Sequence, residues 1–98
     1  MHWPFDKLFD ALTVARDAMR EVFKEFSLSA SVERSEFEEV LRLNADLARH
    51  AEDLLALMLI ENCVDNGVLG EARQLATFFQ ATDRLLSKMF EAADMEAS

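Results

Sequence analysis

The sequence predicts an all-α fold, and three observations support this prediction. Glycine occurs only at positions 67 and 70 and proline only at position 4, which is too few turn residues for a β-rich chain of 98 residues. Helix-forming residues such as Ala, Leu, Glu and Arg are abundant. Apolar residues also recur every three to four positions. We expect one domain over residues 1–98, a three-helix bundle with helices at about 4–26, 32–65 and 68–93.

The first helix is predicted from Pro4, because a proline at the first helical position loses no hydrogen bond. Several like charges lie four residues apart on it, so packing of the apolar stripe must hold this helix. A serine-rich stretch at 27–31 ends it. The stripe consists of Phe5, Leu8, Phe9, Leu12, Ala15, Met19, Val22, Phe23 and Phe26.

The second helix has two candidate starts. Ser35 with Glu38 matches a capping box, and Ser31 is the competing cap. The run from Asp65 through Asn66 to Gly67 predicts its end, with Asn66 or Gly67 in the left-handed conformation. At roughly 30 residues this central helix would be about 45 Å long. That is long for a domain whose expected radius of gyration is about 13 Å.

The third helix is predicted over residues 68–93. Its apolar stripe consists of Leu69, Ala72, Leu75, Ala76, Phe79, Thr82, Leu86, Met89, Phe90 and Ala93, widened by Phe78 and Leu85.

The second helix also predicts self-association. It carries two apolar stripes, and residues 54–60 are apolar all round, so this segment needs cover on every side. Two neighbouring helices of one chain cannot easily supply it. We therefore expect pairing with a second copy into a homodimer, the commonest closed assembly. The alternative is a single bundle with the middle helix as its core. The candidate interface residues are Leu43, Leu54, Leu57, Leu59 and Ile60.

Acidic residues outnumber basic ones by 19 to 10, giving a net charge of −9. This charge opposes direct binding to nucleic acids and to anionic membranes. Residues 31–66 hold nine of the acidic residues and three of the basic ones. Such a surface could dock a basic protein partner, or it could simply keep an apolar chain soluble. The candidate partner-binding residues are Glu36, Glu38, Glu39, Asp46 and Asp53, with Trp3 as a further contact anchor.

His50 is a candidate metal ligand because Asp46 and Asp53 lie four residues before it and three residues after it. On a helix, these spacings place the three side chains on neighbouring parts of one surface, and His with carboxylates can bind a transition metal. A dimer would bring two such sets together. The alternative is a partly buried or interfacial histidine, with Arg42 and Arg49 neutralising the two carboxylates.

The sequence shows no assembled catalytic set. Cys63 lies about 20 Å along the helix from His50, so the two cannot pair within one chain. No Ser–His–Asp spacing, phosphate-binding glycine loop or zinc motif is present. We therefore expect a non-enzymatic protein without a cofactor. The single cysteine, the lack of a spanning apolar run and the absence of an evident signal peptide favour a cytoplasmic location.

These observations favour a protein-interaction module, meaning a regulator, adaptor or inhibitor that acts through helical surfaces and self-association. One alternative is a metal- or small-ligand-binding helical bundle centred on His50. Another is an acidic nucleic-acid mimic that blocks a basic partner.

Overall fold

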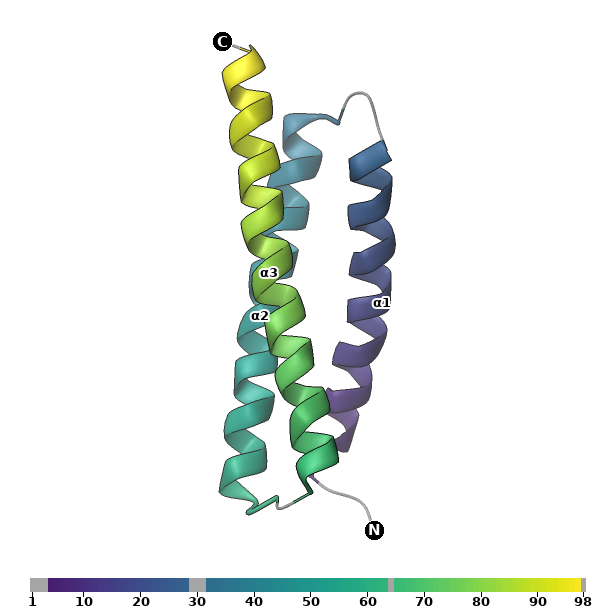
Figure 1. Ribbon diagram of the computed structural model, residues 1–98, viewed down its shortest axis with the longest axis vertical. Helices are drawn as coiled ribbons and strands as arrows, with labels where there is room; N and C mark the ends of the chain where they lie inside the picture. Colours follow the sequence, from purple (N-terminus) through teal and green to yellow (C-terminus); the bar gives the residue numbers. More distant parts are fainter. Residues whose placement is uncertain (1–3, 29–31, 64, 98) are drawn as a thin grey trace.

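In the computed structural model, the chain consists of three helices packed side by side (Figure 1). The structure describes residues 4–28, 32–63 and 65–97, with side chains as far as residue 92. Helix α1 spans Asp6–Leu28, α2 spans Arg34–Ile60 and α3 spans Asn66–Ala97, and these ranges contain no strand. The molecule measures 53 × 18 × 18 Å, so it is a rod with the helices along its length. The all-α, three-helix prediction is confirmed.

The core lies along the rod axis, where the inner stripes of the three helices meet. Its buried hydrophobic residues are Phe5, Leu12, Met19, Phe37, Ala51, Leu54, Met58, Cys63, Ala72, Leu75, Ala76, Phe79 and Leu86. Helices α2 and α3 approach each other closely, whereas α1 touches both of them more sparsely. Near the upper end, the Phe37 ring lies 5.0 Å from that of Phe26 and 6.2 Å from that of Phe90, which joins all three helices.

One polar residue lies inside the close α2–α3 contact. Asn44 on α2 is fully buried, and its Nδ2 donates a hydrogen bond of 2.8 Å to the backbone oxygen of Phe79 on α3. Its Oδ1 has no hydrogen-bond partner among the residues that the structure describes. A buried amide with one definite partner favours one register of the two helices over others.

Helix α1 begins and ends slightly later than predicted. The Phe9 N–H donates to the Phe5 carbonyl, so the first helical turn starts after Pro4. At the other end, the Ser27 hydroxyl donates to the Phe23 carbonyl at 3.0 Å, and the helix continues to Leu28. This serine satisfies a carbonyl of its own helix instead of ending it, which is why the serine-rich stretch was a poor guide to the boundary.

The capping box predicted at Ser35 is absent. Helix α2 begins at Arg34, with Glu33 at the N-cap, and the Glu33 side chain forms no capping hydrogen bond. The Glu33 carbonyl accepts the N–H groups of Glu36 and Phe37, so Ser35 already lies inside the first turn. The competing cap, Ser31, lies outside the described residues.

The turn between α2 and α3 differs from its prediction. Helix α2 ends at Ile60, and Asn62 has the positive φ of 54° that was expected at Asn66 or Gly67. The Asn62 N–H donates to Leu59 and the Cys63 N–H to Met58, which is the double hydrogen bond of a Schellman motif.

Asp65 starts α3 instead of helping to stop α2. Its Oδ1 accepts the backbone N–H groups of Gly67 at 3.0 Å and Val68 at 3.2 Å, so it is the N-cap. Asp-Asn-Gly is compatible with a helix end or a helix start, and only the turn geometry decides between them.

The middle helix is therefore shorter than predicted. Helix α2 has 27 residues, and the longest helix is α3 with 32. In the parts of the chain that the structure describes, no helix combines the length and the apolar character needed to cross a bilayer.

Candidate interaction surfaces

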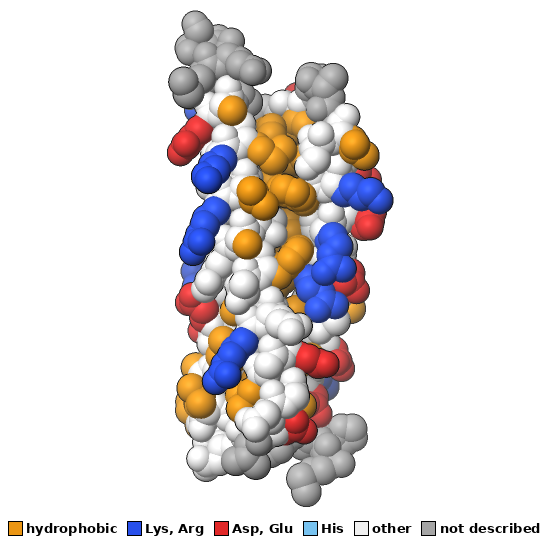
Figure 2. Space-filling view, in the orientation of Figure 1, with side chains coloured by type: hydrophobic (Ala, Val, Ile, Leu, Met, Phe, Trp, Pro, Cys, Tyr) orange, Lys and Arg blue, Asp and Glu red, His pale blue; other side chains and the backbone are white. Residues whose placement is uncertain are grey.

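The last two turns of α2 expose three large aliphatic side chains, Leu57, Leu59 and Ile60, which we call the apolar end of α2. Their exposed fractions are 40%, 67% and 70%. Orange side chains also gather over this lower end of the rod in Figure 2. Leu43, two-fifths of the way along α2, is 52% exposed. These four predicted interface residues are therefore available to a partner.

Leu54, the fifth predicted interface residue, lies elsewhere. It is fully buried in the core between Ala51 and Met58, on the inner side of α2. A helix turns 100° per residue, so a run of apolar residues cannot face one direction. The segment 54–60 is thus divided. Leu54 and Met58 pack inward, whereas the three residues of the apolar end of α2 stay 40% to 70% exposed.

The predicted partner-binding acids lie on the outside of α2, and we call Glu36, Glu38, Glu39, Asp46 and Asp53 the acidic face. All are exposed except Asp46, which is half-buried. Arg34 Nε lies 3.2 Å from Glu38 Oε1, and Arg49 Nη2 lies 2.9 Å from Asp46 Oδ1. Glu36 and Glu39 form no ion pair with any described residue. Exposed pairs of this kind stabilise little, so the face keeps its negative character.

Trp3, the remaining predicted anchor, lies outside the described residues.

The three predicted metal ligands do not come together. The His50 ring is half-exposed, with Nδ1 4.0 Å from Asp53 Oδ2, while the Asp46 carboxylate is paired with Arg49. Over the described ranges, no group of three or more His, Cys, Asp or Glu residues is arranged to hold a metal ion. One chain therefore does not assemble this site in the structure.

Cys63 has a structural role in this arrangement. It is buried, with 6% exposure, because it is the second residue beyond the C-cap Glu61 in the Schellman motif. That position commonly packs against the helix three residues before the cap, which here is Met58. A thiol shielded in this way is not presented to solvent as a nucleophile.

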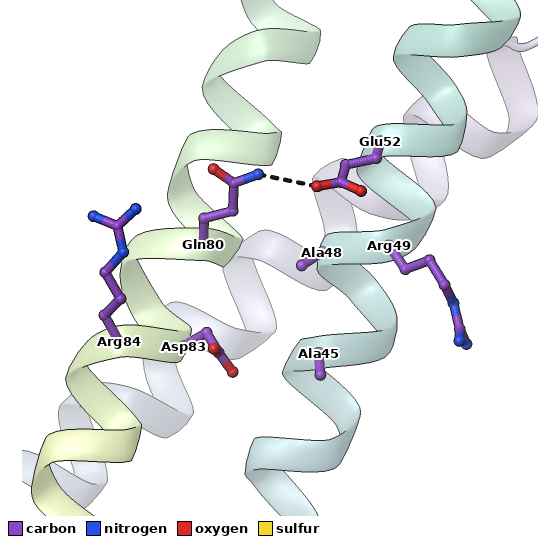
Figure 3. Close-up of a pocket in the computed structure, with 7 residues that line it drawn as sticks. All are labelled: Ala45, Ala48, Arg49, Glu52, Gln80, Asp83 and Arg84. Carbon is purple, nitrogen blue, oxygen red and sulfur yellow. Dashed lines mark hydrogen bonds between the residues drawn. The ribbon is translucent and has the colours of Figure 1, made fainter.

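A groove of about 350 Å³ runs between α2 and α3 (Figure 3). Ala45 and Ala48 leave it open, and Gln80 Nε2 donates to Glu52 Oε1 at 3.2 Å across it. Arg49 and Arg84 both point away from the space between the helices in Figure 3. A second groove, of about 290 Å³, lies between α1 and α3 beside Phe9 and Leu75. Neither groove is lined by a histidine or a cysteine.

Comparison with known proteins gives no relative for this chain: no family model, no curated protein and no solved structure matches it. Its function must therefore be argued from its own surfaces.

Asn44 lies on the inner side of α2, and the sequence pattern did not reveal its role. Its neighbours on that stripe are apolar, and the sequence does not show that an amide at this position would meet the backbone of α3. The signal that could have found it is a lone polar residue with apolar residues three, four and seven positions away.

Proposed function

We propose that this chain is a non-enzymatic protein-interaction module that self-associates through the apolar end of α2. The observation that carries the proposal is the exposure of Leu57, Leu59 and Ile60 on a helix whose inner side is already filled. Leu57 and Ile60, three residues apart, share one side of the last turn, and Leu59 lies about 100° around the helix from Ile60. Burying these side chains against a second copy would be favourable.

The acidic face supports a second contact for the same module, with a basic protein partner. It lies on the same helix but further toward its N-terminal end, so both surfaces can be occupied at once. Glu36 and Glu39, which have no ion pair with the described residues, are the acids with the least local neutralisation. Opposite charge on a partner would chiefly accelerate the encounter and fix its orientation.

Lysine substitutions at the apolar end of α2 test self-association. We expect Leu59→Lys and Ile60→Lys to convert an assembled wild-type protein to the single-chain mass, measured by light scattering after size-exclusion chromatography. A positive charge in the last turn favours a helix, so these changes should leave α2 folded. Circular dichroism checks this.

Val14→Lys is the matched control. Val14 on α1 is 68% exposed, almost the same as Leu59, but it lies on a different helix. Wild type and Val14→Lys should assemble alike. If the wild type has the single-chain mass at micromolar concentration, or if Val14→Lys disrupts assembly as strongly as Leu59→Lys, the proposed surface is wrong.

Charge reversal tests the acidic face separately. Glu36→Lys with Glu39→Lys should leave the mass of the assembly unchanged and should weaken binding to a basic test protein, such as lysozyme, measured at low salt. If the double variant binds lysozyme as the wild type does, the acidic face contributes nothing beyond solubility.

A further inference from the structure

A second surface of this acidic chain has the opposite electrostatic character. One side of α3 carries an apolar strip made of Phe78, Leu85 and Met89. Leu85 follows Phe78 by seven positions and Met89 follows Leu85 by four, so the three side chains share a strip about 16 Å long. Leu85 is 48% exposed, and the other two are half-buried. This strip borders α1, because Arg20 of α1 lies over the Phe78 ring with its Cζ 5.6 Å from the centroid. We call this region the α1–α3 seam.

Basic side chains border the seam on both helices. Arg20 and Lys24, one turn apart on α1, lie on one side. Arg84 and Lys88, one turn apart on α3, lie on the other, where Arg84 also lines the α2–α3 groove. Figure 2 shows the arrangement: in the upper half, orange side chains fill the middle, blue ones lie on both sides, and red ones lie farther out. Lys24, Arg84 and Lys88 form no ion pair with any described residue.

These positive edges need an explanation because the chain carries a net charge of −9. None of the four edge cations forms an ion pair with a described acidic residue, and an apolar strip lies between the two pairs. A surface of this kind is complementary to a partner with an apolar centre and acidic margins.

We propose that the α1–α3 seam docks an amphipathic helix with acidic flanks, supplied by a partner protein. A helix fits the seam because apolar anchors spaced by three, four and seven residues would match the straight strip on α3. Its acidic flanks would meet the two basic edges. A nucleic acid or an anionic bilayer would also be attracted by these edges, but neither supplies the spaced apolar anchors that suit a narrow apolar strip.

The proposal concerns a different surface from the apolar end of α2 and does not depend on self-association. The probe is a synthetic amphipathic peptide of about 18 residues, long enough to be helical, with a leucine face and glutamate flanks. Its matched control has the same leucine face and lysine flanks. Fluorescence anisotropy should show binding of the acidic peptide that weakens as salt rises, and no binding of the basic one.

Variants of the full chain identify the surface. Arg84→Glu combined with Lys88→Glu should weaken binding of the acidic peptide by about tenfold, since two edge contacts are reversed. Arg73→Glu, on the same helix but nearer its N-terminal end, should bind like the wild type. Leu85→Ala should also weaken binding, because it shortens the apolar strip. Circular dichroism should show all three variants equally helical.

Several results would overturn the proposal. One is that the acidic peptide fails to bind, or that it binds no better than the basic one. Another is that the Arg84 and Lys88 reversals change the mass of the wild-type assembly, which would make a second copy the occupant. Tighter binding of a DNA duplex or of phosphatidylserine–phosphatidylcholine vesicles to the same residues would identify a different class of ligand.

Discussion

The α2–α3 pair and α1 are held in this bundle to different degrees. Helices α2 and α3 pack closely, with five buried residues on α2 and the Asn44–Phe79 hydrogen bond between them. Helix α1 buries only Leu12 and Met19 along its length, with Phe5 just before its start. Its contacts with both neighbours are sparser, and Val14 lies largely in solvent.

This difference indicates which helices fix the arrangement of the bundle and which surfaces are available to partners. A closely packed pair with a buried amide fixes its own register. The α1–α3 seam lies beside the less closely held helix, and the apolar end of α2 lies on the outside of the closely packed pair. Neither surface therefore competes with the central packing that holds the fold.

The largest expected effect is a difference between two matched core truncations. Leu54 on α2 and Leu12 on α1 are both buried, with exposures of 0% and 2%. We expect Leu54→Ala to lower the free energy of unfolding by about 4 kcal/mol and Leu12→Ala by about 2 kcal/mol, because α1 can shift to fill part of the cavity. Urea unfolding measures both. Equal losses would mean that α1 is as firmly packed as the α2–α3 pair.

The buried amide gives the next largest effect. Asn44→Ala should lower the free energy of unfolding by about 2 kcal/mol, since it removes a hydrogen bond and leaves a cavity. Asn44→Leu should stay within about 1 kcal/mol of the wild type, because it also removes the unpartnered Oδ1. The same urea titrations apply. An Asn44→Leu protein as unstable as Asn44→Ala would show that the hydrogen bond to Phe79 matters more than the volume of the side chain.

Much of the fold could be predicted from the sequence, and the errors in the predicted helix ends have a common cause. The scarcity of glycine and proline, together with the apolar stripes, was sufficient to predict three helices. The helix ends were not predictable, because Asn62, Asp65 and Asn66 all suit both turns and caps. Which one takes the left-handed conformation depends on where the last turn of α2 meets α3, and that is a tertiary effect.

The interaction surfaces were predictable in part. The sequence showed that residues 54–60 are apolar all round. It did not show that Leu54 would be buried and Leu57 exposed, because that depends on where α3 lies. The α1–α3 seam was not foreseen. It combines Arg20 with Arg84, two residues that only the fold brings to one face.

Helix caps provide a smaller and more local test of the same comparison. Asp65→Ala should lower the free energy of unfolding by about 1 kcal/mol, because it removes the acceptor for the first N–H groups of α3. Ser35→Ala, at the capping box that the structure lacks, should change it by less than about 0.5 kcal/mol. Thermal unfolding followed by circular dichroism gives both values. A loss at Ser35 that equals the loss at Asp65 would contradict the observed start of α2.

The smallest expected effect is at the end of α2. Asn62→Gly should raise the free energy of unfolding by about 0.5 kcal/mol, since glycine adopts a positive φ without the steric cost of a Cβ atom. Asn62→Val should lower it, because a β-branched residue is strained in that conformation. Both changes can be read from thermal midpoints. A stabilising valine would mean that Asn62 is not left-handed in solution.

Hydrogen exchange followed by mass spectrometry, at low and high protein concentration, tests the central claim most directly. In dilute solution α1 should exchange faster than α2 and α3, because it has fewer buried contacts to break. On concentration, exchange should slow over residues 56–61, which include the apolar end of α2, and should stay unchanged around Val14. Exchange that is independent of concentration, or that slows first in α1, would contradict self-association through α2.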